Sequence, residues 1–319
     1  MRVLICGTCA AALNSNYGLL QEITLGFEQL ALSGAAVEAR LVPLETLLDA
    51  IGSWRPGAVL LVGGLALDTI ALPLVHHACA QAQARLVFWS IEDPYELDWM
   101  LRHGHWFDLI LTSDYASRCF YPGHWQVRHL PLASPDRPAP SADQQLRHGA
   151  RWLFCGVSFP TRLAWLNALV PAYPDGLLIG PDWPDYPPPT RVRRHRISAA
   201  VLQALYGALP LTLTLGRDLN LANAAGVVAS TPGPRLFECA GVGGRQLVCG
   251  AGLELGCYYE PQREVLTAAT LQEAVQQLEW AEANPGAMAL LGERAWLRTQ
   301  AEHLYRHRAS RLLSWLRDL

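Results

Sequence analysis

Short apolar runs alternate with longer helical patterns along most of this chain, and this alternation constrains the fold more than any other feature. In the first half, the apolar runs occupy residues 2–6, 37–42, 58–62, 86–89, 109–112 and 127–130. Between them, apolar residues recur roughly every 3.6 positions over 19–32, 44–51, 67–83 and 96–103. Strands that alternate with helices form parallel sheets covered on both faces. The first half is therefore predicted to be a Rossmann-like domain.

The alternation is interrupted once and then starts again. Residues 134–149 are polar and proline-rich, as is typical of a linker. Beyond them, strands are predicted at 152–156, 176–179, 211–215 and 247–249, with helices at 162–169, 198–206, 271–283, 286–316 and from 234 onward. A chain of 319 residues also exceeds what one compact core usually holds.

We therefore expect an α/β protein with two Rossmann-like parallel-sheet domains, residues 1–140 and 141–319, that face each other across a cleft. The terminal helices are expected to pack back on the first domain. Open parallel sheets bind ligands at the carboxyl ends of their strands. Candidate site residues are therefore expected where predicted strands end.

Composition narrows the classes of function. Hydrophobic residues make up 51% of the chain and charged residues 17%, which suits large buried cores. All 25 basic residues are arginines, so Schiff-base chemistry and a phosphate-loop lysine are both excluded. The formal net charge of -3 provides no long-range attraction to nucleic acid or to an anionic membrane. Nucleic acid is therefore not an expected partner.

The sequence also predicts a cytoplasmic protein without a transmembrane segment. The 8 cysteines are scattered through apolar segments, which is typical of buried, reduced thiols. The apolar stretch 58–75 is interrupted by Asp68 and Pro73, which disfavours a membrane span. Residues 2–6 lead directly into Gly7, which favours a first strand over a leader peptide.

The strongest local motif is the segment 230–238, Ser-Thr-Pro-Gly-Pro-Arg-Leu-Phe-Glu. Pro234 suits the first turn of a helix, where free backbone N–H groups favour a phosphate. Arg235 adds a planar bidentate donor for the same anion. Glu238, one turn further on, is placed to accept both hydroxyls of a ribose. The alternative is a capping role for Glu238 and a surface role for Arg235.

A second turn of this kind spans residues 155–162. The predicted strand ends at Gly156, and Ser158 or Thr161 caps a helix that carries Arg162. These residues are candidates to meet the phosphates of a donor. Taken alone, the segment is better explained by an ordinary strand–turn–helix connection with a good N-cap.

Three further residues are candidates to contact a phosphate-bearing ligand. Gly180 ends a predicted strand, and Trp183, on the loop that follows, is a candidate to stack on a nucleobase. Packing in the core is the alternative for Trp183. Asn220 lies one loop before the 230–238 segment and is a candidate to reach the donor, with a turn asparagine as the equal alternative.

In the first half, Asp93 follows a predicted strand directly. Because it precedes Pro94, it should be extended rather than helical. A carboxylate at this position is a candidate base for an acceptor hydroxyl. The alternative is a cap for the helix that begins near Pro94. A base is required only if the reaction inverts configuration.

Several motifs are absent from the sequence. There is no Asp-x-Asp triplet for a diphosphate-bound metal, and no Gly-x-Gly-x-x-Gly follows the first strand. The histidines at 76, 77, 103 and 105 lack a metal-ligand context and are interpreted as packing or surface residues. No metal site is predicted, and a dinucleotide dehydrogenase is disfavoured.

Taken in order, these pieces resemble the bacterial glycosyltransferases grouped with spore maturation proteins, which have the GT-B fold. The hallmark of that group is matched by Arg235-Leu236-Phe237-Glu238 followed by Cys239-Ala240-Gly241. The other matching pieces are Gly156 with Arg162, Leu219-Asn220, residues 262–265, the segment His303-Leu304-Tyr305-Arg306-His307-Arg308, and in the first half residues 89–95, 107–110, Asp114 and 129–133. The resemblance covers nearly the whole chain.

The resemblance implies a glycosyltransferase that binds a nucleotide-sugar donor in the C-terminal domain and an acceptor in the N-terminal domain. It implies no cofactor beyond the nucleotide sugar and no bound metal. Arg235 and the Gly156 turn would meet the diphosphate, and Glu238 the ribose. The chain departs from its larger relatives at Ser230, where they have a glutamate, and at Leu304, where threonine is usual.

The predicted function is therefore metal-independent transfer of a sugar from a nucleotide-diphosphate sugar to a protein, glycan, lipid or small molecule. Arg235 is the predicted electrostatic catalyst, and Asp93 the candidate base. Two alternatives remain: a nucleotide-sugar epimerase of the same fold, and a non-catalytic nucleotide-sugar-binding protein.

Overall fold

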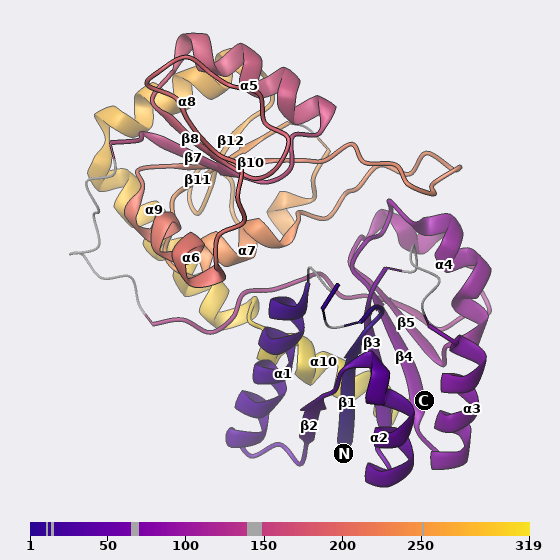
Figure 1. Cartoon of the computed structure of the whole chain (residues 1–319). Helices are drawn as coiled ribbons and strands as arrows, with labels where there is room; N and C mark the ends of the chain where they lie inside the picture. The colour runs from indigo at the N-terminus through magenta and orange to yellow at the C-terminus, as the bar shows by residue number, and fades with distance from the viewer. Residues whose placement is uncertain (11, 14–15, 65–69, 139–148, 251) are drawn as a thin grey trace. The chain divides into compact units, whose positions relative to one another are not determined.

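The computed structural model describes residues 1–10, 12–13, 16–64, 70–138, 149–250 and 252–319. These residues form two compact units, each built around a parallel sheet (Figure 1). Unit 1 contains Met1–Pro135, Asn220–Thr231 and Leu304–Leu319, and unit 2 contains Asp136–Leu219 and Pro232–His303. The two predicted Rossmann-like sheets are confirmed.

Unit 1 carries a sheet with the strand order β2-β1-β3-β4-β5-β6. Its strands are β1 (Arg2–Gly7), β2 (Glu38–Leu41), β3 (Ala58–Gly63), β4 (Arg85–Ser90), β5 (Leu109–Thr112) and β6 (Val127–His129). Its helices are α1 (Tyr17–Leu32), α2 (Leu47–Trp54), α3 (Leu72–Ala82), α4 (Leu97–His103) and α10 (Tyr305–Arg317). Every strand pair is parallel. The central strands are apolar along their whole length because both faces of the sheet are covered.

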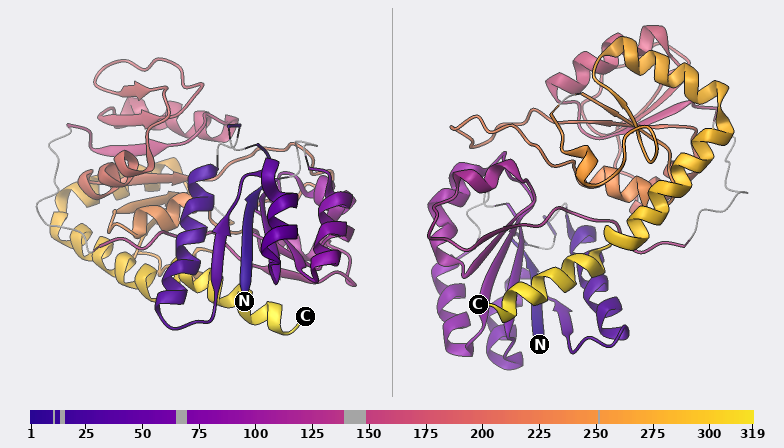
Figure 2. Two further views of the ribbon diagram at one scale, coloured as in Figure 1. Left: turned by 60° about the horizontal axis from the view of Figure 1, so that its bottom comes forward. Right: turned by 180° about the vertical axis from the view of Figure 1, so that it is seen from behind.

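Helices α1 and α10 cover one face of this sheet, and α2 and α3 cover the other. Helix α10 lies alongside α1 although the two are far apart in the sequence (Figure 2). The approach is close at Gly26, where a Cβ atom would lie 2.6 Å from the carbonyl carbon of Tyr305. A residue larger than glycine at this position would force the two helices apart.

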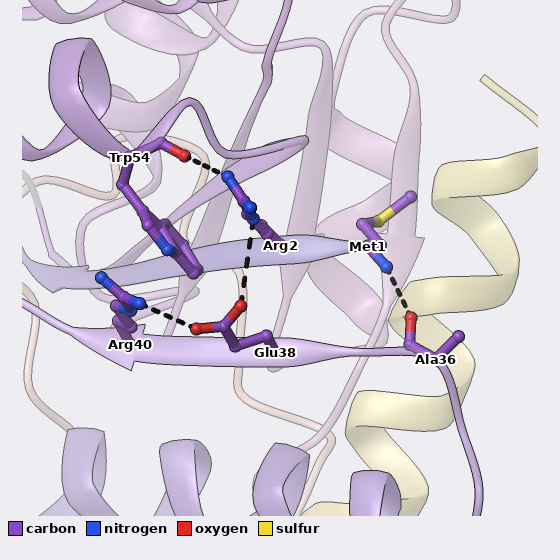
Figure 3. Close-up of polar contacts among 6 residues, drawn as sticks. All are labelled: Met1, Arg2, Ala36, Glu38, Arg40 and Trp54. Carbon is purple, nitrogen blue, oxygen red and sulfur yellow. Dashed lines mark hydrogen bonds and ion pairs between the residues drawn. The ribbon is translucent and has the colours of Figure 1, made fainter.

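The free edge of the unit 1 sheet, at β2, is tied to its neighbours by polar contacts around Trp54 (Figure 3). Glu38 lies 2.9 Å from Arg40 and 3.9 Å from Arg2. Both guanidinium groups lie over the Trp54 ring, at 4.5 Å for Arg40 and 5.8 Å for Arg2. These half-exposed pairs contribute little individually. Charged side chains along an edge strand also discourage pairing with another chain.

Unit 2 has the strand order β12-β11-β10-β7-β8-β9, again all parallel. Its strands are β7 (Trp152–Cys155), β8 (Gly176–Ile179), β9 (Arg191–Arg193), β10 (Thr212–Leu215), β11 (Gln246–Cys249) and β12 (Leu266–Ala268). Its helices are α5 (Pro160–Ala172), α6 (Ala199–Ala208), α7 (Pro234–Ala240), α8 (Leu271–Ala283) and α9 (Pro285–Glu302). Helices α5 and α8 pack on one face of the sheet, and α6 and α7 on the other.

Most predicted elements are confirmed to within two or three residues, and the differences have physical causes. Strands β9 and β12 were not predicted, because each is three residues long and β9 is mostly arginine. The single helix predicted over 286–316 is two helices, with the break at His303 and Leu304. The expected start of the helix at 67–83 lies outside the described residues.

The compact units also differ from the predicted ranges 1–140 and 141–319. The division falls after Pro135, and the chain returns to unit 1 at residues 220–231 and 304–319. Each unit is therefore assembled from segments that are distant in the sequence. In the part of the chain that the structure describes, no helix combines the length and apolar character that a membrane crossing requires.

Candidate functional site

The strand order of the unit 2 sheet reverses between β7 and β10. β8 and β9 follow on one side of β7, whereas β10 lies on the other side. Ligands of open parallel sheets bind at the carboxyl ends of the strands at such a point. Arg162, in the first turn of α5, lies there. It donates to the carbonyl oxygens of Gly216 (2.8 Å), Val157 (3.1 Å) and Leu215 (3.2 Å). Arg162 therefore joins the two segments that leave β7 and β10.

These contacts give Arg162 a structural role, and its contact with the phosphates of a donor stays a prediction. Its guanidinium is already engaged by backbone carbonyls, and it lies over the rings of Phe154 and Phe159. The nearby carboxylate of Asp218 accepts a hydrogen bond from the backbone N–H of Thr161 at 3.1 Å and so caps the start of α5. The side chains of this turn therefore hold the loops that follow β7 and β10 together.

Gly156 and Gly180 form a tightly packed corner where β7 and β8 end. Gly180 has φ +139°, and a Cβ atom there would lie 2.1 Å from the carbonyl oxygen of Gly156. The same oxygen accepts a hydrogen bond from the indole of Trp183 at 2.8 Å. Ser158 donates to the carbonyl of Asp182 at 2.8 Å and joins the two loops. Glycine is therefore required at position 180 by both conformation and space.

The structure corrects the stacking role predicted for Trp183. Its side chain is only 2% exposed and packs edge-on against Phe154, with ring centroids 5.5 Å apart. An indole enclosed in the core cannot offer a face to a nucleobase. The packing alternative describes this residue.

Arg235 and Glu238 form an accessible ion pair on the first turn of α7. The guanidinium donates to the Glu238 carboxylate at 2.5 Å, and the two side chains are 47% and 22% exposed. Desolvation opposes the charge on Arg235, but the Glu238 carboxylate together with Tyr206 and Cys155 outweighs it, and the pKa of Arg235 is raised above its usual value. Arg235 therefore stays cationic at any physiological pH.

The pair lies within electrostatic range of the β7 end. Burial raises the pKa of the Cys155 thiol, while Arg235 and Arg162 lower it and Glu238 raises it. Tyr206, on α6, is also nearby, and burial raises its pKa well above the usual value. Its hydroxyl has no hydrogen-bond partner among the residues that the structure describes. No motif marked Tyr206, because an aromatic residue on an apolar helix face is expected in any core.

Asn220 is not with these residues but in the segment of the chain that belongs to unit 1. Its side-chain amide donates to the carbonyl of Asn223 at 3.3 Å. This contact matches the turn role that was the alternative for Asn220. The structure thus gathers Gly156, Ser158, Arg162, Gly180, Trp183, Arg235 and Glu238 in unit 2, and places Asn220 and Asp93 in unit 1.

Asp93 is enclosed in unit 1, which corrects its predicted role as a base that meets an acceptor. Its side chain is 4% exposed, and its carboxylate accepts hydrogen bonds from Ser90 (2.8 Å) and Tyr121 (2.7 Å). Burial raises its pKa to about 6, although hydrogen bonds from Thr112, Tyr121 and Ser90 oppose the shift. These contacts join the ends of β4 and β5 and leave no oxygen directed at solvent.

Asp114, which follows β5, holds residues 230 and 231 on unit 1. Its Oδ1 accepts the backbone N–H groups of Ser230 (2.7 Å) and Thr231 (3.0 Å). Its Oδ2 accepts the N–H (2.9 Å) and hydroxyl (2.8 Å) of Ser117. His129 completes the contact at 3.1 Å from the Thr231 hydroxyl, and burial lowers its pKa to about 4. The first two residues of the 230–238 motif therefore belong to unit 1.

The strand order of the unit 1 sheet also reverses, between β1 and β3, and this is the switch point of that sheet. Thr8 follows β1, and Gly63 ends β3 with φ +153°. A Cβ atom on Gly64 would lie 2.2 Å from the carboxylate of Glu96, a side chain that is 5% exposed. Sequence reasoning selected Asp93 in this region, and only the fold shows that Glu96 lies nearer the switch point.

Within the described ranges, no grouping of three or more histidine, cysteine, aspartate or glutamate side chains has the geometry to hold a metal ion. The described cysteines are free thiols. Near the carboxyl ends of β7 and β10, Arg162 and Arg235 supply positive charge, and Asp218 and Glu238 supply carboxylates.

Two units with parallel sheets in these strand orders define the class of protein as a GT-B-type α/β protein. Residues 162–314 match the family described as Glycosyl transferase-like. The chain has the GT-B fold, and its C-terminal half is similar to this glycosyl transferase-like family. No curated protein matches the sequence significantly.

Several solved structures are similar to the chain. HepE of Anabaena, in complex with UDP and glucose, is 12% identical with a TM-score of 0.64, and 100% of each chain is covered. Sucrose-phosphate synthase of Thermosynechococcus elongatus is 13% identical with a TM-score of 0.63, and 100% of this chain and 99% of that chain are covered. AviGT4, a glycosyltransferase of avilamycin A biosynthesis, is 14% identical with a TM-score of 0.59 and coverage of 99% and 97%. At these identities the likeness shows the fold alone.

Proposed function

We propose that this protein transfers a sugar from a nucleoside diphosphate sugar, with UDP as the nucleotide, to an acceptor hydroxyl without a metal ion. The observation that supports this most directly is the half-exposed Arg235–Glu238 pair on α7, close to the end of β7. A cation that neighbours a carboxylate and remains accessible suits a ligand that carries both phosphates and a ribose. HepE, which has the same fold, binds UDP and UDP-glucose.

In the proposed reaction, the bond between the anomeric carbon and the diphosphate breaks, and negative charge develops on the departing diphosphate. Arg235 stabilises this charge more in the transition state than in the ground state, which is the requirement for catalysis. The acceptor hydroxyl forms the new bond and releases its proton. Because Arg235 is permanently charged, the leaving group is neutralised without a metal.

Glu238 accepts the ribose hydroxyls in this proposal, so the donor replaces the Arg235–Glu238 contact with two contacts of its own. The cost of separating the pair is small because both side chains are partly solvated. Arg162 and Asp218 keep the β7 and β10 loops in place. The acceptor is taken by unit 1, where the switch point near Thr8 and Glu96 is the corresponding site.

The test is Arg235→Ala, measured as turnover of UDP-sugars and as UDP affinity. We expect turnover to fall by on the order of 100-fold, which corresponds to a loss of about 3 kcal/mol of transition-state stabilisation. The midpoint of unfolding should be nearly unchanged. Arg298→Ala is a matched control, because Arg298 also pairs with a carboxylate one turn away on a helix of unit 2, at 3.1 Å from Glu302. Unchanged turnover in Arg235→Ala would contradict the proposal.

Two further arms of the same assay test the finer points. Incubation with a chelator should leave turnover unchanged if no metal takes part. Incubation of the donor without an acceptor should return the sugar unaltered, because epimerisation would change the donor alone. Binding of UDP with no transfer to any acceptor class would favour a non-catalytic binding protein.

A further inference from the structure

The edge strand β9 of unit 2 opens a run of basic residues that is unlike the rest of the chain. Residues 191–196 read Arg-Val-Arg-Arg-His-Arg, so this run holds four of the chain's 25 basic residues. Residues 186–217 contain no aspartate or glutamate at all. The net charge of -3 for the whole chain therefore conceals a strongly cationic segment.

Only some of these basic side chains form ion pairs or hydrogen bonds that the structure shows. Arg194 donates to the carbonyl of Trp183 at 2.9 Å and pairs with Asp185 at 2.6 Å. Arg193, His195 and Arg196 are exposed, and among the described residues they form no ion pair. Like charges at this spacing repel one another, so an unpaired cluster of this kind is expected to attract an anionic partner.

Protection of a sheet edge accounts for only part of the run. β9 is the outermost strand of its sheet, and charged side chains on such a strand prevent pairing with another chain. Arg191 and Arg193 suit this role because they lie on the strand. Arg194, His195 and Arg196 lie beyond its end, where no strand edge needs protection.

The run leads directly into an uncharged helix start. Ser198 caps α6, and its hydroxyl accepts the backbone N–H of Val201 at 3.3 Å. The residues of the first turn, Ala199, Ala200 and Val201, are all exposed, and Val201 is 45% exposed. The first turn of α6 contains no acidic residue. Exposed cationic residues are thus followed closely in the chain by exposed apolar residues.

We propose that residues 191–201 form a docking surface for an anionic lipid membrane. Each basic residue near an anionic leaflet strengthens partitioning roughly fivefold, and small apolar side chains beside the charges enter the headgroup layer. A few such residues give reversible binding rather than permanent attachment. The surface concentrates the protein at a membrane and stands independently of the proposed sugar transfer.

The residue types favour a membrane over nucleic acid. Single-stranded nucleic acid is bound by aromatic side chains interleaved with the cations, and residues 191–201 contain no tyrosine, tryptophan or phenylalanine. A free phosphate requires converging donors in a concave site. A short exposed run on a sheet edge is better matched to a flat, diffuse negative charge.

The test is sedimentation of the full-length protein with vesicles of phosphatidylcholine that contain phosphatidylglycerol, compared with vesicles of phosphatidylcholine alone. We expect binding only to the anionic vesicles and loss of binding as salt rises. The double variant Arg193→Gln with Arg196→Gln should lower the partition coefficient roughly 20-fold. The control is Arg311→Gln with Arg317→Gln, two exposed arginines of α10 in unit 1, which should bind like the unchanged protein.

Three outcomes would overturn the inference. The first is absence of binding to the anionic vesicles at low salt. The second is equal loss of binding in the control and the Arg193/Arg196 variant, which would indicate a response to total charge. The third is a preference for duplex or single-stranded DNA over anionic vesicles, which would assign the surface to nucleic acid.

Discussion

Unit 1 and unit 2 share a parallel six-stranded sheet but use charged side chains at the carboxyl ends of their strands in different ways. In unit 1, Asp93 and Asp114 are buried, and their oxygens accept hydrogen bonds from neighbouring loops. In unit 2, Arg235 and Glu238 remain partly exposed and pair mainly with each other. A buried charge whose bonds are all satisfied holds structure together, whereas an accessible pair can exchange its partner for a ligand.

The comparison also explains why sequence motifs do not separate structural residues from accessible ones. Asp93 and Arg235 both stand next to a proline at the end of a loop, and the sequence does not distinguish them. Exposure does: 4% for Asp93 against 47% for the Arg235 side chain.

The first prediction concerns the glycine corner of unit 2. Gly180→Ala should destabilise the protein by roughly 4 kcal/mol, because it adds backbone strain at φ +139° and a contact of 2.1 Å with the Gly156 carbonyl. Urea unfolding measures the loss. Gly286→Ala, on α9 of the same unit, is the control, since a Cβ atom there meets nothing within 4 Å. Equal effects of the two substitutions would show that the corner is not closely packed.

The second prediction concerns the anchor of unit 1. Asp114→Ala should cost roughly 3 kcal/mol, because it leaves the buried N–H groups of Ser230, Thr231 and Ser117 without an acceptor. Asp98→Ala is a graded control, since Asp98 accepts only the Ala224 N–H in the same segment and is partly exposed. Hydrogen exchange at residues 220–231 should accelerate most in Asp114→Ala. Unchanged exchange there would mean that other contacts hold the segment.

The third and smallest prediction concerns pH. The folded-state pKa of Asp93 is raised from 3.8 to about 6, so the native state keeps a proton that the unfolded chain has released. Asp93 therefore stabilises the fold fully below its unfolded pKa, and this contribution is lost as pH rises through about 6. The slope is at most about 1.4 kcal/mol per pH unit.

Asp93→Asn removes this titration while it keeps an oxygen for Ser90 or Tyr121. The difference in unfolding free energy between the two proteins, measured at several pH values in this window, isolates the contribution of Asp93. A constant difference across the window would show that the carboxylate is not protonated in the native state.

Much of the fold could be predicted from the sequence because the central strands are buried on both faces. Runs such as Ala58–Gly63 are apolar at every position, so their boundaries are clear. Edge strands lack this signal. β9 forms backbone hydrogen bonds with only one neighbouring strand and consists of two arginines around one valine. Neither its hydrophobic periodicity nor its composition therefore indicates a strand.

The site was less predictable, because the same residue type serves opposite roles in different surroundings. Arg162 and Arg235 both follow a proline at a helix start, yet three carbonyls engage the first and a carboxylate pairs with the second. Trp183 and Asp93 were also indistinguishable from exposed residues at the level of motif. Tyr206 and Glu96 became visible only once the strand order placed them near a switch point.

The position of α10 has a consequence for how the protein is made. Tyr305, Leu312 and Leu316 pack on the sheet of unit 1 with β1 and β3, although they are synthesised long after the strands of that sheet. A ribosome that adds about 5–20 residues per second needs on the order of 10 to 30 seconds to travel from β6 to α10. During that interval the part of this face that α10 covers in the folded protein is exposed, so unit 1 completes its core only after the strands of unit 2 have been made.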